Sequence, residues 1–293
     1  MNSRILLLGA EGQVGREIRA LAASRGAWLK GLGHSSCNII DRETIDAAVA
    51  AYRPTLIVNA AAFTAVDRAE SEPELAHAVN TMGAGFIAEV AAKRNIPLLH
   101  FSTDYVFDGT KYGAYNEGDQ VAPLGVYGRS KEEGERRIRE VCAHHIILRT
   151  AWIFGIHGNN FLKTMLRLAE GHPSLRVVTD QRGSPTATID LAQATMAVRD
   201  EICKGRIQWG TYHFAGQGEA TWYEFAQVIM AERASILGSA PQVVPITTSE
   251  YPTLASRPVN SVLDSDRFAE VFGLRSKPWQ KRVRETVAAL VKR

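Results

Sequence analysis

The sequence has no long hydrophobic run and no recognisable leader. None of its apolar stretches approaches the ~18 residues that a membrane-spanning helix requires. The first apolar stretch, Ile5 to Leu8, is too short for a signal peptide, and no small-residue cleavage site follows it. We therefore expect a cytoplasmic protein without a membrane partner.

Cysteine is also scarce, and the net charge is small. The three cysteines, Cys37, Cys142 and Cys203, are odd in number and far apart, which fits neither a disulfide framework nor a metal-ligand spacing. The net charge is only +3, and no basic stripe with interleaved aromatic residues is present, so we expect no nucleic-acid partner. These absences exclude secreted disulfide scaffolds and nucleic-acid-binding modules.

Alternating strands and helices fill the first half of the 293-residue chain. Apolar strands are predicted at 5–8, 27–32, 56–59, 96–101 and 145–150, with helical segments between them. This order predicts an α/β fold, a Rossmann-type doubly wound parallel sheet, with a smaller C-terminal domain. We assign residues 1–150 to a dinucleotide-binding domain, with sheet elements returning near 175–215, and residues 151–293 mainly to a substrate-binding domain.

A glycine-rich loop joins the first strand to the first helix. Gly9, Gly12 and Gly15 have the spacing G-x-x-G-x-x-G, which allows a backbone to approach a pyrophosphate at a helix N-terminus. A glycine turn without a ligand is the alternative. The second strand ends in Gly33-His34 without the carboxylate of an NAD-specific site, so the sequence favours NADPH and leaves NADH open.

Three residues further along predict ketone reduction. Thr103 follows a buried strand, and Tyr127 and Lys131 are four apart, on one face of a predicted helix. We expect the Lys131 ammonium to lower the pKa of Tyr127 so that the phenol can act as a proton donor. Thr103 would orient a substrate carbonyl beside a bound nicotinamide.

Several motifs resemble the extended short-chain dehydrogenase/reductases, and most closely the dTDP-4-dehydrorhamnose reductase family. The similarity covers nearly the whole chain. It is carried by the segments Val58 to Ala62, Thr64 to Asp67, Ser102 to Gly109, Val126 to Gly128 with Lys131, Arg149-Thr150 with Trp152, Asn160 to Met165, and Arg257 to Ser261. The resemblance implies NAD(P)H-dependent reduction of the 4-keto group of dTDP-4-dehydro-β-L-rhamnose to dTDP-L-rhamnose, the last step of dTDP-rhamnose biosynthesis.

The resemblance also implies roles for individual residues. Thr103, Tyr127 and Lys131 would be catalytic. The cofactor-binding positions would be Gly9, Gly12, Gln13, Val14, Gly15, Asn38, Ile39, Ala61, Ala62, Thr64, Tyr127 and Lys131. The substrate-binding positions would be Val66, Thr103, Asp104, Tyr105, Trp152, Asn160 and Arg257.

Two positions depart from the family pattern. Asn38 stands where the family usually has Asp at the adenine contact. Some relatives hold Mg²⁺ between subunits with acidic residues; Glu17 matches one such position, but Ile189 stands at another. Mg²⁺ therefore stays open as a second cofactor but is disfavoured, no metal ligand is assigned, and the chain is expected to be a monomer or a homodimer.

Other activities on the same fold stay open. A reductase of another nucleotide-linked 4-keto-deoxysugar would need the same three catalytic residues. A non-catalytic NADP-binding regulatory subunit, like the homologue that partners methionine adenosyltransferase, would bind the cofactor without turnover. A 4,6-dehydratase is disfavoured because Thr103 is followed by Asp104-Tyr105 rather than by an Asp-Glu pair.

Overall fold

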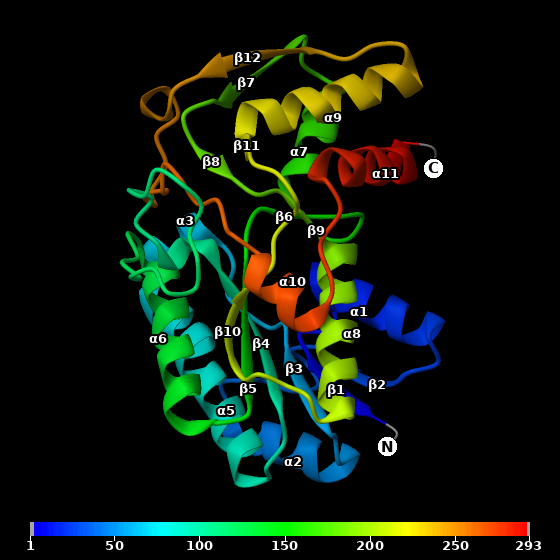
Figure 1. Ribbon diagram of the computed structural model, residues 1–293. Helices are drawn as coiled ribbons and strands as arrows, with labels where there is room; N and C mark the ends of the chain where they lie inside the picture. Colours follow the sequence, from blue (N-terminus) through cyan, green and yellow to red (C-terminus); the bar gives the residue numbers. More distant parts are fainter. Residues whose placement is uncertain (1–2, 292–293) are drawn as a thin grey trace.

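The structure, a computed structural model, describes residues 3–291. A six-stranded sheet runs through the lower half of the molecule in Figure 1, in the order β10-β5-β4-β3-β1-β2. Every neighbouring pair in it is parallel. Its strands are β1 (Arg4–Leu8), β2 (Trp28–Leu32), β3 (Leu56–Asn59), β4 (Leu98–Thr103), β5 (His145–Thr150) and β10 (Gly210–His213). This is the predicted Rossmann-type fold.

The sheet is buried on both faces because its central strands are apolar throughout. In β1, Ile5 and Leu7 pack into one core cluster, and Leu6 and Leu8 pack into the cluster on the opposite face. Alternate residues of a strand point to opposite faces, so a strand covered on both sides needs a continuous apolar run.

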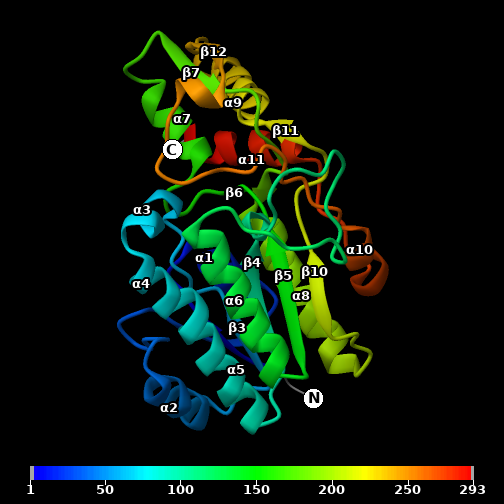
Figure 2. The same ribbon diagram turned by 90° about the vertical axis from the view of Figure 1, so that its left-hand side faces the viewer.

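Helices cover the two faces in separate layers. One face is covered by α1 (Gln13–Ser24) and α8 (Thr188–Lys204), which pack against each other. The opposite face is covered by α2 (Arg42–Tyr52), α5 (Ala84–Lys93) and α6 (Val126–Val141), which lie across the front of the sheet in Figure 2. Two further short helices, α3 (Val66–Ser71) and α4 (Pro73–His77), lie above α5 in that view.

The upper part of the molecule has its own apolar core. It contains α7 (Phe161–Leu168), α9 (Trp222–Leu237) and α11 (Trp279–Val291), with the parallel pair β7 (Ser174–Val178) and β12 (Gln242–Ile246) above them (Figure 1). Thr221 and Glu224 form a capping box at the start of α9. The remaining elements are β6 (Ile153–Phe154), β8 (Arg182–Gly183), β9 (Thr186–Ala187), β11 (Ala220–Thr221), α10 (Asp266–Phe272) and the 3₁₀ turns η2 (Asp104–Val106) and η3 (Thr248–Glu250).

Residues 151–291 contribute to both halves of the molecule. The strand β10 and the helix α8 complete the lower sheet and its cover, while α7, α9 and α11 lie above. A buried ion pair joins the two parts, because the Arg282 guanidinium of α11 donates to Asp190 of α8 from Nε at 3.0 Å. No helix within residues 3–291 is both long and apolar enough to span a membrane.

The helical segment that leads into β4 is not one regular α-helix. A π-helix, η1 (Ala78–Gly83), separates α4 from α5. The segment carries two buried polar residues that apolar periodicity does not reveal: Asn80 donates to Ser130 Oγ at 3.0 Å, and Thr81 Oγ1 donates to the Ser130 carbonyl at 2.8 Å. These contacts tie η1 to α6, the helix that carries Tyr127 and Lys131.

Candidate active site

The glycine loop lies at the carboxyl end of β1, where the chain must pass very close to its neighbour β3. Gly9 has φ +78°, and a Cβ there would lie 2.5 Å from the Ala61 nitrogen. A Cβ on Gly15 would lie 2.2 Å from the Gly9 carbonyl oxygen. Helix α1 starts directly after Gly12, so its free N–H groups face this loop. The loop has the geometry of a pyrophosphate site.

Two neighbouring cavities extend along the carboxyl ends of the strands from this loop. One, of about 470 Å³, is lined by Gly9, Glu11, Gly12, Gly33, His34, Cys37, Asn38, Ile39, Ala60, Ala61, Ala62, Phe63, Arg68, Leu75 and Val79. The other, of about 380 Å³, is lined by Glu11, Gly12, Gln13, Val14, Ala60, Ala61, Ala62, Thr64, Phe101, Ser102, Tyr127, Lys131, Thr150, Ile153, Gly158 and Asn159. The two cavities share Glu11, Gly12 and Ala60 to Ala62, so they form one groove with the glycine loop at its middle and Tyr127 and Lys131 at one end. The groove fits an elongated dinucleotide.

The three residues predicted to be catalytic are all buried in this region. Tyr127 and Lys131 lie one turn apart on α6, and Thr103 is the last residue of β4. Strand β4 extends two residues beyond its predicted end at Phe101, so Thr103 belongs to the sheet itself. The Thr103 hydroxyl lowers the pKa of Tyr127 by hydrogen bonding. It also donates to Asp104 Oδ1 at 3.0 Å and accepts from the Tyr105 N–H at 3.2 Å.

The pKa of Tyr127 differs from the sequence-based expectation. Burial is the main cause that raises it, to about 12; hydrogen bonding to Thr103 partly lowers it, and the Asp104 charge adds to the rise. The expected lowering by Lys131 is not found, because the Lys131 Nζ points elsewhere: it donates to the Phe101 carbonyl at 2.6 Å and lies 3.2 Å from His100 Nε2. Burial in turn lowers the pKa of Lys131 to about 8. In the protein alone, Tyr127 is therefore a neutral phenol.

Asp104 and Tyr105 follow Thr103 and lie beside Tyr127. Burial raises the pKa of Asp104 to about 6. The Tyr105 ring contacts the Tyr127 ring edge-on, with centroids 5.5 Å apart, and burial raises the Tyr105 pKa well above its ordinary value. Val66 packs against the same cluster. These residues surround the phenol with an aromatic ring, an apolar side chain and one buried carboxyl group.

Trp152 has a strained backbone. Its φ is +45°, a left-handed conformation that costs a non-glycine residue about 1–3 kcal/mol. The ring stacks on Trp222 of α9 at a centroid distance of 3.5 Å, and a Cβ on Gly183 would collide with it. The stack holds Trp152 at the junction between the two parts of the molecule.

Asn160 and Arg257 make contacts with the opposite part of the chain. Asn160 caps α7 and also donates to Gln13 Oε1 of the glycine-loop region at 2.9 Å. Arg257 forms an ion pair with Asp67 of α3, with an Nη2–Oδ2 distance of 2.8 Å. Both residues were predicted at the substrate; in the structure, each bridges the segments that border the groove.

The structure thus brings most of the predicted site residues together. Gly9, Gly12, Asn38, Ile39, Ala61 and Ala62 line the larger cavity; Gly12, Gln13, Val14, Ala61, Ala62, Thr64, Tyr127 and Lys131 line the smaller one. Gly15, Val66, Thr103, Asp104, Tyr105, Trp152, Asn160 and Arg257 are not among the lining residues of either cavity. Of these, Thr103, Tyr105 and Val66 lie around the Tyr127 side chain.

Some residues at the groove were not identified from the sequence. The Glu11 carboxylate lies against Gly33, since a Cβ on Gly33 would be 2.4 Å from its carboxyl carbon. It brings to the end of β2 a negative charge that the sequence of β2 does not contain. His100 and Asn59 are also buried behind Lys131. The sequence gives no sign that His100 lies beside Lys131, because it is a single histidine within an apolar strand and only the fold brings the two residues together.

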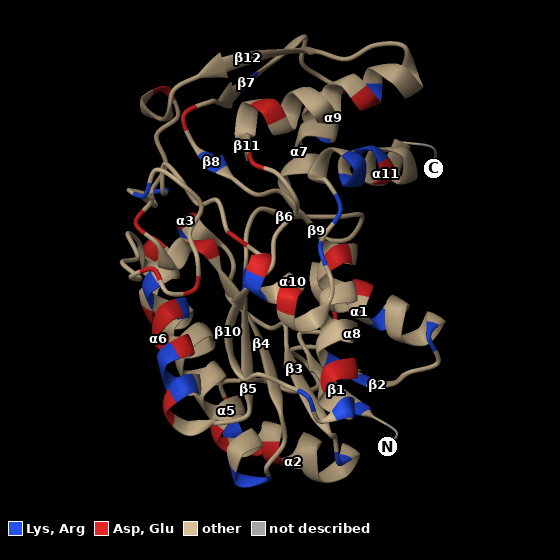
Figure 3. Cartoon of the chain, viewed as in Figure 1, with Lys and Arg blue, Asp and Glu red and all other residues tan. Residues whose placement is uncertain are grey.

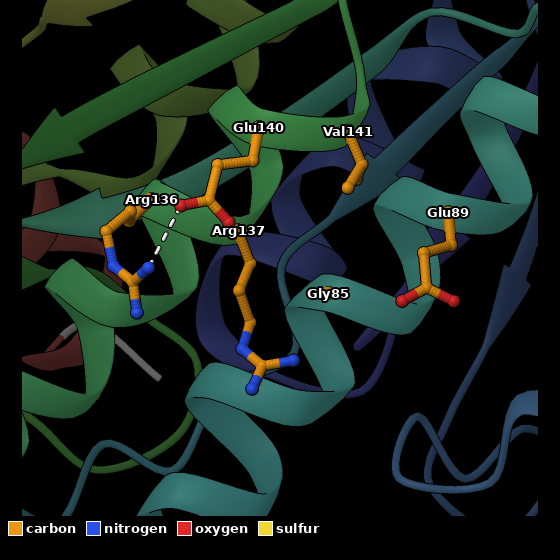
Figure 4. Close-up of a pocket in the computed structure, with 6 residues that line it drawn as sticks. All are labelled: Gly85, Glu89, Arg136, Arg137, Glu140 and Val141. Carbon is orange, nitrogen blue, oxygen red and sulfur yellow. Dashed lines mark hydrogen bonds and ion pairs between the residues drawn. The ribbon is translucent and has the colours of Figure 1, made fainter.

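The remaining charged surface does not belong to this site. Figure 3 shows Lys, Arg, Asp and Glu alternating along the outer side of α6. A cavity of about 260 Å³ between α5 and α6 is lined by Gly85, Glu89, Arg136, Arg137, Glu140 and Val141 (Figure 4). Arg136 and Glu140 pair with each other at 2.9 Å. This hollow is a solvated ion-pair surface on the side of α6 away from Lys131.

The structure does not support the Mg²⁺ site that the resemblance left open. Within residues 3–291, no three His, Cys, Asp or Glu side chains are grouped to hold a metal ion. Glu17 instead accepts from Thr188 Oγ1 at 3.4 Å and lies 4.0 Å from His157 Nε2.

Comparison with known proteins places this geometry among related enzymes. The family model described as RmlD substrate binding domain matches residues 3–292. The dTDP-4-dehydrorhamnose reductase of Aggregatibacter actinomycetemcomitans is 43% identical over 95% of this chain and 96% of its own. The crystal structure of a dTDP-4-dehydrorhamnose reductase from Clostridium acetobutylicum is 35% identical, with a TM-score of 0.91 over 98% of this chain and 99% of that one. That of the Bacillus anthracis enzyme in complex with NADP is 32% identical, with a TM-score of 0.90 over 99% and 100% of the two chains.

Proposed function

This chain belongs to the RmlD substrate binding domain family, and on that basis we propose that it reduces dTDP-4-dehydro-β-L-rhamnose to dTDP-L-rhamnose with NADPH. The observation that carries the proposal is that Tyr127 and Lys131 line the same cavity as the glycine loop. A proton donor therefore lies at one end of a dinucleotide-shaped groove, as reduction of a ketone requires.

The order of the residues along the groove supports a cofactor-binding role for each of them. Asn38 and Ile39 would contact the adenine; Gly9, Gly12, Gln13, Val14 and Gly15 would surround the pyrophosphate; Ala61, Ala62 and Thr64 would line the path to Tyr127 and Lys131. Gly9 and Gly15 act through backbone approach, since neither has room for a Cβ. NADPH, when bound, supplies the hydride.

The NADP complex of the Bacillus anthracis relative supports binding of NAD(P)H, and we propose NADPH as the preferred form. His34 and Arg68 line the larger cavity and could contact a 2′-phosphate. The Glu11 carboxylate opposes this preference, because it would repel such a phosphate. The preference therefore depends on the balance between these charges.

Catalysis is assigned to Thr103, Tyr127 and Lys131. Tyr127 would donate its phenolic proton to the carbonyl oxygen of the sugar as the alkoxide develops. The Thr103 hydroxyl, which already lowers the pKa of Tyr127, would hold that oxygen next to the phenol. Tyr105, Val66, Asp104, Trp152, Asn160 and Arg257 would form or support the sugar side of the site, with the 151–293 segment covering it.

The experiment follows NADPH absorbance with dTDP-4-dehydro-β-L-rhamnose, comparing wild type with Tyr127→Phe. We expect the wild type to oxidise NADPH, and the variant to bind NADPH but to lose activity by ~10²-fold or more, because the proton donor is missing. Tyr112→Phe is the matched control, since that ring is almost fully exposed in the loop after β4. Full activity in Tyr127→Phe would refute the catalytic assignment. A wild type that binds NADPH without reducing this sugar would refute the substrate.

A further inference from the structure

Behind the catalytic lysine lies a chain of three buried polar side chains. Asn59, His100 and Lys131 are only 1%, 1% and 2% exposed. Asn59 Nδ2 lies 2.9 Å from His100 Nδ1, and His100 Nε2 lies 3.2 Å from Lys131 Nζ. The residues come from the carboxyl end of β3, from β4 and from α6, so only the folded sheet brings them together.

The orientation of the Asn59 amide is fixed by the backbone. Asn59 Oδ1 accepts the Ala61 N–H at 3.0 Å, so Nδ2 is the atom that faces His100. An amide nitrogen can only donate, and His100 Nδ1 must therefore accept. The reversed amide would place two donors against each other at Ala61.

This contact determines the tautomer of the imidazole. A neutral histidine carries one ring proton, and since Nδ1 accepts, that proton is on Nε2. The imidazolium would need a second proton on Nδ1, pointing at the Asn59 donor. Burial lowers the pKa of His100 well below its usual value, which agrees with a neutral ring.

The Nε2–H of His100 in turn points at Lys131. An ammonium has three donors and no lone pair, so it cannot accept this hydrogen bond, whereas a neutral amine can. The amine retains two N–H groups, one of which donates to the Phe101 carbonyl at 2.6 Å. The contacts with His100 and Phe101 both suit an amine, whereas an ammonium would face the Nε2–H of His100 donor to donor.

We propose that His100 is a positioning residue for Lys131: in the Nε2–H tautomer that Asn59 enforces, it donates a hydrogen bond to the lysine and stabilises the neutral amine. The inference goes beyond the three catalytic residues and identifies what sets the charge of one of them. Its consequence for catalysis, though not the hydrogen-bond arrangement itself, rests on the proposed function.

Other charged groups near Lys131 act in the opposite direction or cancel. On α6, the Glu135 charge favours the ammonium. That carboxylate is itself paired with Arg149 of β5, with an Nε–Oε1 distance of 2.9 Å, and with Arg139 of α6. Tyr127, the remaining titratable neighbour on α6, is neutral. On β4, the His100 side chain contacts Lys131 Nζ directly, and its Nε2–H favours the amine form of the lysine over the ammonium.

For the reduction, a stabilised amine means that the Lys131 ammonium gives up its proton more readily. Once the Tyr127 phenol has passed its proton to the sugar oxygen, the phenolate would recover one from the Lys131 ammonium through water in the cavity that both residues line, because Nζ itself points towards Phe101 and His100. The lysine is then the amine that His100 stabilises, and it takes a new proton from solvent water. One proton enters from water and one leaves on the product hydroxyl, so the sequence balances.

The first test measures the tautomer in the wild-type protein without cofactor or sugar. The ¹⁵N NMR shifts of histidine-labelled protein separate protonated from unprotonated ring nitrogens, and the His100 signals are those missing from His100→Gln. We expect an unprotonated Nδ1 and a protonated Nε2 from pH 6 to 9. A proton on Nδ1 would overturn the proposal, whatever the protein's activity.

The second test moves the tautomer. In Asn59→Asp, a carboxylate would accept from Nδ1–H, leaving Nε2 to accept from the ammonium. We expect both ring nitrogens to exchange their shifts, and the pKa of Lys131, followed by ¹³Cε NMR of labelled lysine, to rise by about one unit. His100→Gln should leave the pKa near its wild-type value, since its amide can accept from Asn59 and donate to Lys131. His145→Gln, a buried histidine of the next strand, is the matched control.

A second background tests whether Asn59→Asp changes the Lys131 pKa through the tautomer of His100 or through the charge of the new carboxylate. In His100→Phe, which breaks the connection, the Asn59→Asp replacement should no longer raise the Lys131 pKa. An equal rise in that background would assign the effect to the carboxylate alone and refute the proposal. If the tautomer is as expected but the sugar is not reduced, the inference about His100 stands and the proposed function fails.

Discussion

Three ionisable residues of α6 follow one another at four-residue intervals, and the surroundings of each move its pKa differently. Burial raises the pKa of Tyr127 to about 12 and lowers that of Lys131 to about 8. Burial also raises the pKa of Glu135, but Arg149 outweighs it and the carboxylate ends at about 2. The helix thus presents a neutral phenol, a lysine that titrates near neutral pH and a permanent carboxylate in successive turns.

The Glu135 carboxylate should make stability depend on pH. Its folded pKa of about 2 lies below the ordinary 4.5, so its contribution is fully present above pH ~4.5 and is lost as the pH falls towards 2. Glu135→Gln leaves the buried Arg149 without its counter-charge, which we expect to cost about 3–5 kcal/mol at pH 7. Urea unfolding at several pH values should show this difference shrinking below pH 4.5.

The control for this prediction lies on the same helix. Glu140 pairs with Arg136 on the exposed side of α6, so Glu140→Gln should change stability little at any pH. A Glu135→Gln variant as stable as Glu140→Gln at pH 7 would show that the buried pair contributes no more than the exposed one.

At the scale of the element, helix α6 approaches two neighbouring backbone segments so closely at two glycines that no side chain would fit there. A Cβ on Gly128 would lie 2.2 Å from the Tyr105 carbonyl oxygen, and one on Gly134 would lie 2.2 Å from the Asn80 carbonyl oxygen. The first contact seats the helix against the turn after Thr103, and the second seats it against η1. The distance from Tyr127 to Thr103 therefore depends on two glycines.

Gly128→Ala should separate the helix from the turn that follows β4. We expect a loss of about 1–3 kcal/mol in stability from the overpacking, together with a larger loss in kcat than in NADPH affinity. Thermal unfolding and steady-state kinetics measure the two effects. Gly113→Ala is the control, because a Cβ there meets nothing within 4 Å. Wild-type kcat in Gly128→Ala would mean that the close contact does not position Tyr127.

The elements also show what sequence reasoning can reach. The strands, the glycine loop and the Tyr127–Lys131 pair were predictable because each is a local pattern of a few residues. The π-helix η1, the Glu11 carboxylate beside Gly33 and the contact of His100 with Lys131 were not, because each depends on residues far apart in the chain. The Tyr127 pKa was mispredicted for the same reason: burial and the direction of the lysine are properties of the fold.

At the scale of the whole molecule, two parts meet over the groove. The Arg282–Asp190 pair links α11 to α8, the Trp152–Trp222 stack joins the end of β5 to α9, and Arg257 reaches Asp67 on α3. The last two links lie next to residues that line the groove, since Ile153 follows Trp152 and Arg68 follows Asp67. A sugar nucleotide entering between the two parts would therefore meet the cofactor groove on one side and residues from the 151–293 segment on the other.

The central claim, that this molecule transfers hydride to the 4-keto carbon of a dTDP-sugar, is tested most directly by isotope transfer. The enzyme would be incubated with dTDP-4-dehydro-β-L-rhamnose and NADPH carrying deuterium at both C4 positions of the nicotinamide, and the product analysed by NMR and mass spectrometry. We predict dTDP-L-rhamnose with a single deuterium at C4 of the sugar, and no labelled product from Tyr127→Phe in the same time. Unchanged 4-keto sugar, or deuterium at another carbon, would contradict the account.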